Sequence, residues 1–332
     1  MSQGDLIRRV ASRLGIECEV DSTAPNLLRL TYPNGATRYV PDSDFAVNRA
    51  ASLIVSDIKP NIYSFLRQAG HAVPEYEVFF ADSWARQFGL DRDEAAASAF
   101  AAQLGYPVVV KPANSYRGRG VQLAFAPGEL AGAITGALAF DIMFIVQRYI
   151  AGQEYRLVVF DGAVRLAYRK YPLEIVGDGR NTCQQLIEAS LEASRRGGIP
   201  ADVTAADPRI DPFLSNQGLA RDVVPEPGRT CRVGLAAGFP AGGRLVESWD
   251  RLPAGLAEEA IAVTHMSGLR LAGLDILVAP SGTCYTLDVN SPPALAGYAA
   301  LGSRQRERTE ALVADLLGAM GAAGATAPGR PA

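Results

Sequence analysis

The sequence predicts a mixed α+β fold of the α/β type with more than one lobe. Helical periodicity over 61–68, 92–103 and 304–320 alternates with short β-branched runs that predict strands. The run 144–161 is two apolar strands separated by a polar break at 151–153. Such a segment favours a connector that crosses between two lobes.

Pattern breaks also predict the lobe boundaries. The N-terminal part has a helix over 5–14 and two strands around 27–30 and 37–40, joined by the turn Pro33-Asn34-Gly35. A Gly-, Pro- and Asp-rich stretch at 195–217 predicts a mobile excursion. We expect a short N-terminal lobe at 1–55, a second lobe at 56–146, a third at 147–320 and a disordered tail at 321–332.

The chain contains only three lysines, Lys59, Lys111 and Lys170, so that 29 of its 32 basic residues are arginines. The lysine ammonium is a compact charge that fits among phosphate oxygens, whereas the planar guanidinium needs more room. Lysines kept in such a sequence are candidates for phosphate binding. The alternative is a codon bias that left three solvated lysines by chance.

Lys111 ends the apolar run YPVVVK and is followed by the polar stretch PANSYRGRGV, which contains Gly118 and Gly120. Glycines let backbone N–H groups approach an anion closely. A strand, a lysine and a glycine loop therefore predict a polyphosphate cradle, although an ordinary hairpin turn has a similar pattern. The chain contains no GxxxxGK[ST] motif.

A second candidate site is the segment LDILVAPSGTCYTLDVN at 274–290, which predicts a β-hairpin around a Pro-Ser-Gly turn. Asp288 and Asn290 are two residues apart and share one face, and Asp275 lies on the partner strand. Three oxygen ligands suit a hard cation such as Mg²⁺, with Mn²⁺ as an alternative, and a nucleotide is its usual companion. The alternative is a hairpin that is polar only because it lies at the edge of a sheet.

In the connector, Glu154 follows the polar break between the two strands. A carboxylate there is suited to accept both hydroxyls of a ribose, while backbone groups near Arg148 and Ile150 face an adenine edge. Taken alone, the segment is only a strand, a turn and a strand. Arg195 and Arg196 are candidates for binding a carboxylate substrate, although a solvated charge pair is the more common explanation.

Composition excludes several classes of function. A formal net charge of −3 and the lack of a basic stripe argue against nucleic acid, and no apolar run reaches membrane-spanning length. The four cysteines are widely spaced without nearby histidines, which argues against zinc. We expect a cytoplasmic enzyme with small-molecule substrates, and a homodimer is left open.

In order along the chain, several motifs resemble ATP-grasp enzymes, in particular the ATP-grasp portion of cyanophycin synthetases and of bifunctional glutathione synthetases. The similar segments are SDIKPNIYSFLRQAGHAVPE, VVVKPANSYRGRGV, QRYIAGQEYRLVVFDG and KYPLEIVGDGRNTCQQLIE. The resemblance runs from about residue 6 to about residue 317. It implies two α+β lobes that sandwich ATP, preceded by a truncated pre-ATP-grasp lobe.

The resemblance also implies a mechanism. A substrate carboxylate attacks the γ-phosphate of ATP to give an acylphosphate, and an amine then displaces phosphate to form an amide. The implied catalytic residues are Arg169, Lys170 and Asn290, and the implied metal ligands are Asp275, Asp288 and Asn290. The implied nucleotide-binding residues are Lys59, Lys111, Ser115, Arg117, Gly118, Gly120, Gln147, Arg148, Ile150 and Glu154.

Some positions depart from the family pattern. Gln147 and Asp288 stand where glutamates are usual, and a family stretch that supplies an arginine and an asparagine aligns with VGLAAGFPAGG at 233–243. Arg232, Arg244 or Arg169 are candidates to replace that arginine. No ligase module of the Mur type follows, so we expect a stand-alone enzyme. A phosphotransferase and a nucleotide-binding protein without catalysis stay open as alternatives.

Overall fold

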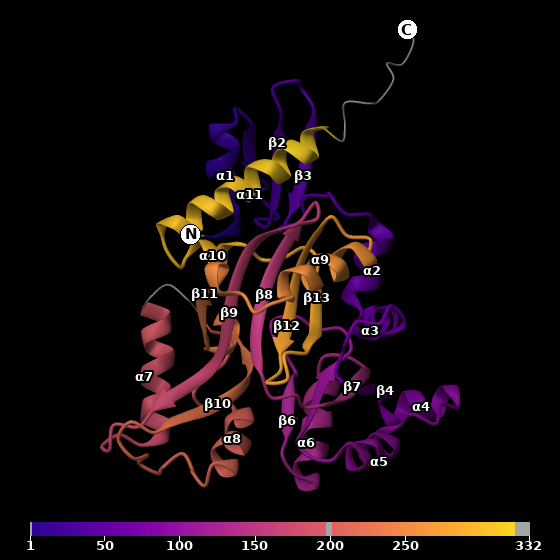
Figure 1. Cartoon of the computed structure of the whole chain (residues 1–332), viewed down its shortest axis with the longest axis vertical. Helices are drawn as coiled ribbons and strands as arrows, with labels where there is room; N and C mark the ends of the chain where they lie inside the picture. Colours follow the sequence, from indigo (N-terminus) through magenta and orange to yellow (C-terminus); the bar gives the residue numbers. More distant parts are fainter. Residues whose placement is uncertain (1, 197–200, 323–332) are drawn as a thin grey trace.

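The computed structural model of the chain describes residues 2–196 and 201–322. Its strands form three antiparallel sheets, which are spread along the long axis of the molecule (Figure 1). Most of the predicted tail, residues 323–332, lies outside the described residues. No helix of the described part is long and apolar enough to cross a membrane.

The N-terminal sheet has the order β1-β2-β3, and it is covered by the first and last long helices. These elements are α1 (Gln3–Arg13), β1 (Glu17–Val20), β2 (Leu27–Thr31), β3 (Thr37–Pro41) and α11 (Ser303–Ala322). The predicted turn is confirmed, with Gly35 in the left-handed region at φ 80°. The sequence grouped α11 with the third lobe, yet it also packs against α1 because both helices bury apolar faces in one cluster.

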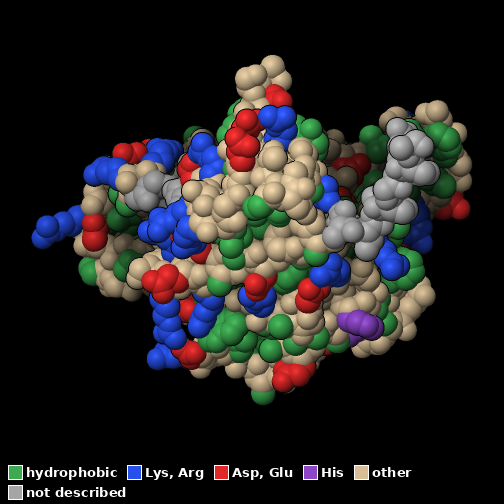
Figure 2. All heavy atoms as spheres, turned by 90° about the horizontal axis from the view of Figure 1, so that it is seen from above, with side chains coloured by type: hydrophobic (Ala, Val, Ile, Leu, Met, Phe, Trp, Pro, Cys, Tyr) green, Lys and Arg blue, Asp and Glu red, His purple; other side chains and the backbone are tan. Residues whose placement is uncertain are grey.

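Polar contacts also hold α11 to this lobe. The hydroxyl of Tyr32 donates a hydrogen bond to the carbonyl oxygen of Leu317 at 2.7 Å, and Arg13 pairs with the buried Glu310 at 2.6 Å. Figure 2 shows this end of the molecule, where acidic and basic side chains are intermixed. That face therefore carries no field of a single sign.

The second sheet in chain order, which we call the middle sheet, has the order β4-β7-β5-β6. Helices α5 and α6 cover the face that carries Val108, Val110 and Val146, because successive strand residues point to opposite faces. The opposite face, with Val109 and Lys111, is turned away from these helices. The elements are α2 (Ala50–Asp57), α3 (Lys59–Gln68), β4 (Tyr76–Phe80), α4 (Asp82–Phe88), α5 (Glu94–Leu104), β5 (Val108–Pro112), β6 (Gln122–Ala124), α6 (Pro127–Leu138) and β7 (Met143–Arg148).

The third and largest sheet has the order β10-β9-β8-β12-β13, with β11 paired to β9. Its strands are β8 (Gln153–Phe160), β9 (Ala163–Val176), β10 (Thr230–Ala237), β11 (Arg244–Glu247), β12 (Leu271–Val278) and β13 (Cys284–Asn290). Its helices are α7 (Cys183–Arg196), η1 (Pro208–Ile210), α8 (Asp211–Asn216), η2 (Phe239–Ala241), η3 (Trp249–Arg251), α9 (Leu256–Met266) and α10 (Ala296–Ala299). The predicted hairpin is confirmed as β12 and β13.

Helix α9 covers the face of this sheet that carries Tyr155, Leu157 and Val159. Glu154 and Arg156 point to the other face, toward the middle sheet. Residues 149–152 connect β7 to β8 and thereby join the two sheets. The fold therefore brings the Lys111 face of the middle sheet, on which α3 also packs, and one face of the third sheet toward each other.

We expect the docking of α11 to be a main source of stability for the N-terminal lobe. Leu316 is fully buried, so Leu316→Ala should lower the free energy of unfolding by about 2–5 kcal/mol. Leu14 is 45% exposed, so Leu14→Ala should change it by no more than about 0.5 kcal/mol. Urea denaturation of both variants measures the difference, and equal effects would contradict this packing.

Candidate functional site

Lys111 lies at the centre of the candidate site, near the end of β5. It is only 5% exposed, and its Nζ donates to the hydroxyl of Tyr63 at 2.8 Å. The Tyr63 hydroxyl in turn donates to the carbonyl oxygen of Leu287 on β13 at 2.5 Å. Burial, and next the neighbouring charge of Lys59, lower the pKa of Lys111 to about 7. This ammonium is therefore held in place without a carboxylate in direct contact.

Lys59 begins α3 and bridges the two lobes. Its Nζ donates to the carbonyl oxygen of Ser115 at 2.9 Å and lies 3.7 Å from a carboxylate oxygen of Asp288. The side chain is almost fully buried. Two of the three lysines thus lie together where the middle sheet meets the predicted metal hairpin.

Gln147 on β7 is opposite Val109 in register and shares the face that carries Lys111. It is 5% exposed, and no described residue donates to its Oε1 atom. An orphaned buried acceptor costs free energy unless a ligand satisfies it. Its place beside the connector suits the exocyclic amino group of adenine, and the residues present therefore fit a nucleotide.

The glycine loop connects β5 to β6 and adopts left-handed backbone conformations. Arg117, Gly118 and Gly120 have φ values of 61°, 72° and 70°. A Cβ atom at Gly120 would lie 2.7 Å from Cγ of Pro112, so no larger residue fits there without a shift. The loop is therefore pressed closely against the strand that carries Lys111.

The glycine loop also contacts the excursion of the third lobe. Arg117 makes a bidentate pair with Asp202 at 2.7 and 3.1 Å, and Arg209 donates to the carbonyl oxygen of Gly118 at 3.4 Å. Nearby, the rings of Phe125, which follows β6, and Phe213 on α8 pack edge to face with centroids 5.3 Å apart. These contacts close the two lobes over the site.

On the third sheet, a row of charged side chains faces the lysines. Glu154 is opposite Lys170 in register, and the two form an ion pair. Asp275 accepts two hydrogen bonds from Arg156, at 2.6 and 2.7 Å, and lies 3.1 Å from Nζ of Lys170. Burial alone would raise the pKa of Asp275, but the two cations hold it well below its ordinary value.

The hairpin brings the three predicted metal ligands to neighbouring positions. Asp275 is opposite Asp288, and Gly273 is opposite Asn290. Both Asp275 oxygens are engaged by cations at short distance, whereas Asp288 accepts the N–H of Val289 at 3.2 Å and lies 3.7 Å from Nζ of Lys59. Within residues 2–196 and 201–322, no group of three or more His, Cys, Asp and Glu side chains could hold a metal. Asp288 and Asn290 fit a hard cation that completes its shell with phosphate oxygens and water.

Other predicted residues lie away from this cluster. Arg169 is on the face of β9 opposite to Lys170, where its guanidinium stacks on the ring of Tyr171 at 4.3 Å. The side chain of Arg148 pairs with Glu75 at 2.7 Å. The Arg148 side chain is thus engaged. For hydrogen bonds to an adenine edge, Arg148 offers only its backbone atoms, as does Ile150 in the connector.

The two arginines proposed to bind a carboxylate substrate also lie apart. Arg195 and Arg196 both pair with the exposed Glu192 within one turn of α7, as expected of a solvated charge pair.

Four residues of the site did not come from the sequence: Tyr63, Arg156, Asp202 and Phe213. Arg156 could have been found, because it follows Glu154 by two residues and must share its face. Tyr63, four residues after Lys59 on a helix, could have been found in the same way. Asp202 lies outside helices and strands and Phe213 on the short helix α8, and neither segment is long enough for a periodicity that predicts direction.

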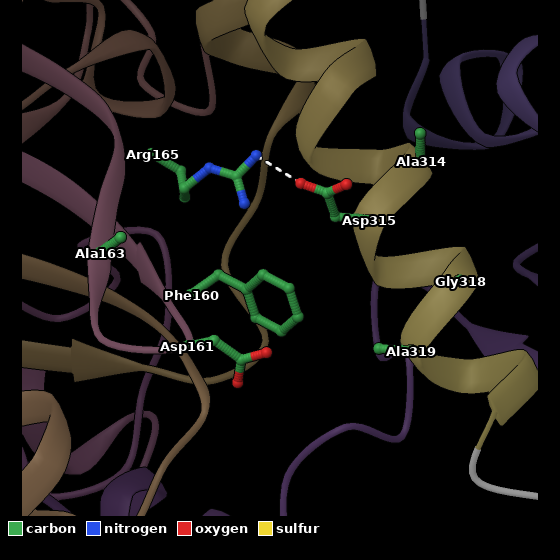
Figure 3. A pocket seen from close by; sticks show the side chains of 8 residues that line it. All are labelled: Phe160, Asp161, Ala163, Arg165, Ala314, Asp315, Gly318 and Ala319. Atoms are coloured by element: carbon green, nitrogen blue, oxygen red, sulfur yellow. Dashed lines mark hydrogen bonds and ion pairs between the residues drawn. The ribbon is translucent and has the colours of Figure 1, made fainter.

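A separate surface pocket lies between α11 and the β8–β9 turn (Figure 3). Arg165 pairs there with Asp315 at 2.6 Å, and the side chains of Phe160 and Asp161 line the same pocket. None of the predicted site residues lines it. We therefore place the chemistry at the facing sheets.

Comparison with known proteins agrees with the fold and with the motifs. Residues 65–179 match the D-ala D-ala ligase C-terminus family. Solved structures that resemble the chain include a bifunctional glutathione synthetase from Pasteurella multocida, with TM-score 0.52 and 20% identity over 89% of this chain and 40% of that one. A D-alanine–D-alanine ligase from Bacillus anthracis has TM-score 0.51 and 14% identity over 83% of this chain and 72% of that one. The likeness to these solved structures shows that the chain has the ATP-grasp fold.

Curated relatives show the same resemblance in sequence. A cyanophycin synthetase from Nostoc sp. is 30% identical over 192 residues, which are 57% of this chain and 20% of the relative. A glutathione biosynthesis bifunctional protein from Listeria innocua is 24% identical over 279 residues, 82% of this chain and 35% of the relative. The chain thus spans about a fifth to a third of the length of these relatives, and the predicted resemblance is confirmed.

The depressed pKa of Lys111 should make the free energy of unfolding depend on pH. The unfolded chain binds this proton up to about pH 10.5, whereas the folded chain releases it near pH 7. The cost of burying the charge is therefore fully present below pH 7 and fades as the pH rises to 10.5. Lys111→Met should be more stable than the wild type at pH 6 by on the order of a few kcal/mol, with the advantage shrinking toward pH 10.5. Urea denaturation across this range tests it, and a pH-independent difference would be the contrary result.

The contact between Arg117 and Asp202 should protect the glycine loop from proteolysis. In Asp202→Ala we expect trypsin to cleave after Arg117 and Arg119 about two- to fivefold faster, as suits a half-exposed pair worth up to about 1 kcal/mol. Glu192→Ala is the matched control, because Glu192 pairs only with exposed arginines on α7. Equal loop cleavage in wild type and Asp202→Ala would show that the pair does not close the loop.

Proposed function

We propose that the chain is an ATP-dependent carboxylate–amine ligase that releases ADP and phosphate. The observation that carries this proposal is the meeting of two buried lysines, Lys59 and Lys111, with the oxygen ligands of the β12–β13 hairpin. A buried cation with no carboxylate in direct contact, as at Lys111, favours an anionic ligand. The named relatives support an amide-forming ligase, and their greater length leaves the substrates of this chain to be proposed.

ATP would bind between the middle and third sheets. The acceptor Oε1 of Gln147 suits the adenine amino group, and Glu154 suits the ribose hydroxyls once Lys170 turns to the phosphates. Lys59, Lys111 and the N–H groups of the glycine loop would hold the phosphate chain. Lys59, Lys111 and Gln147 are buried, whereas Glu154 and the glycine loop are partly accessible to a ligand.

Asp288 and Asn290 would hold Mg²⁺, or Mn²⁺ in its place. When bound, the ion neutralises phosphate charge and stabilises the transfer. Asp275 has a different role in this arrangement, because Arg156 and Lys170 engage both of its oxygens. It would orient these two cations toward the phosphates.

The reaction has two steps. A carboxylate oxygen of the first substrate attacks the γ-phosphorus, and the bond to the bridging oxygen breaks with ADP leaving. The nitrogen of an amine then attacks the acyl carbon, the carbon–oxygen bond to phosphate breaks, and the amine loses a proton. Positioning and charge neutralisation supply the catalysis, and no residue forms a covalent bond.

Exclusion of water is the second requirement, because an acylphosphate hydrolyses in contact with solvent. The glycine loop, Asp202 and Phe213 would provide this cover through the contacts between the lobes. Opening of the loop would admit the nucleotide.

The substrates we propose are an amino acid or small peptide as the acid and a small-molecule amine. The names of the relatives support this class, since one is a D-alanine–D-alanine ligase and others make glutathione or cyanophycin. A cytoplasmic location suits both an ATP-using enzyme and the four free cysteines of the described chain.

The test is ATP turnover with Mg²⁺ and hydroxylamine across pools of amino acids and dipeptides. The proposal predicts ADP release together with a hydroxamate that depends on one acid. Lys111→Ala should lower turnover by roughly 100-fold or more, as expected for loss of a buried charge on a transferring phosphoryl group. Arg165→Ala, outside the site, should retain it. A stable phosphoester with ADP release would instead identify a phosphotransferase, and nucleotide binding without ADP release in any pool would contradict catalysis.

A further inference from the structure

Arg156 is a buried arginine on the face of β8 that carries Glu154. Its side chain is 13% exposed. The Nε and Nη2 atoms donate to the two oxygens of Asp275 at 2.6 and 2.7 Å. This bidentate pair fixes the plane of the guanidinium.

The third nitrogen, Nη1, remains available. It makes no hydrogen bond with any residue in the described ranges 2–196 and 201–322. It lies over Gly273, since a Cβ atom built at this glycine would be 3.0 Å from it. Gly273 is opposite Asn290 in register, so Nη1 lies beside the proposed metal ligand. The absence of a side chain at position 273 leaves room for the guanidinium.

The arginines offered from the sequence as replacements for the missing family arginine are engaged elsewhere. Arg232 donates to the backbone oxygens of Gly234 and Leu235 and to the Tyr149 hydroxyl. Arg244 is more than half exposed and stacks on the ring of Tyr171 at 3.7 Å.

Arg169 stacks on the same ring, on the face of β9 opposite to Lys170. Of the arginines considered, Arg156 alone pairs with Asp275 on the face that carries Glu154 and Lys170.

We propose that Arg156 is a further catalytic residue whose Nη1 group contacts the transferred phosphoryl group. The inference rests on the proposed function. The phosphoryl oxygens carry the negative charge during transfer, and a donor already in place stabilises it without reorganisation. Arg156 keeps its protons throughout, and Asp275 positions it.

The test compares the affinities of ADP and of a non-hydrolysable ATP analogue by calorimetry with Mg²⁺. In Arg156→Ala the dissociation constant of the analogue should rise roughly 10- to 100-fold, the loss of one or two charge-assisted hydrogen bonds, while that of ADP changes by less than about twofold. Arg165→Ala is the matched control, an arginine paired with one carboxylate outside the site. Its affinities should equal those of the wild type.

Gly273→Ala is a second variant that keeps every charge. A Cβ atom at position 273 would lie 2.7 Å from Cβ of Pro293 and 3.0 Å from Nη1 of Arg156, so the guanidinium must move, and the analogue should again bind more weakly while ADP does not. If both variants bind the analogue as tightly as the wild type does, the role of Arg156 is overturned and the ligase proposal stands. If the wild type binds neither nucleotide, both proposals fail.

Discussion

Burial of unlike charges between two facing sheets is the constraint on which the rest of the structure depends. Lys59, Lys111, Arg156 and Lys170 lie there with the carboxylates Glu154, Asp275 and Asp288, and Asp57 adds a further negative charge near Lys59 and Asp288. Removing a charge from water is costly unless a partner compensates it. Asp275 and Glu154 satisfy Arg156 and Lys170, which leaves Lys111 beside a tyrosine hydroxyl and with a depressed pKa. An anion that binds beside Lys111 would stabilise its positive charge, and this links the fold directly to the binding of an anionic ligand.

The three sheets contribute to this site in different ways. Helices α5, α6 and α9 cover the outer faces of the middle and third sheets, and the polar residues of the inner faces contact each other and α3, which supplies Lys59 and Tyr63. Residues 149–152 set the separation of these faces by joining β7 to β8. The N-terminal lobe contributes no residue to the site, but α11 packs both on it and on the end of the third sheet. Closure then depends on weak contacts at the edge, such as the pair of Arg117 with Asp202, which suits a site that must open for substrates.

Alternation along strands predicted much of the site from the sequence. The β12–β13 hairpin, Lys111 at the end of its strand and Glu154 after the connector all lie where the period of two puts them. Long-range pairing was not predictable in this way. No local sequence pattern predicts that Asp275 pairs with Arg156, since 119 residues separate them. For Arg169 the sequence reasoning failed for a local reason. Adjacent residues on a strand point to opposite faces, so Arg169 and Lys170 could not both reach one ligand.

Proton uptake on ATP binding tests the central claim most directly. At pH 8 the Lys111 side chain, with a pKa of about 7, is largely neutral in the free protein. A polyphosphate beside it favours the charged form, so binding should take up about one proton per ATP. Calorimetric titration in two buffers of different ionisation enthalpy measures this number. The account predicts uptake in the wild type and none in Lys111→Met. Binding with no proton uptake in the wild type would contradict it.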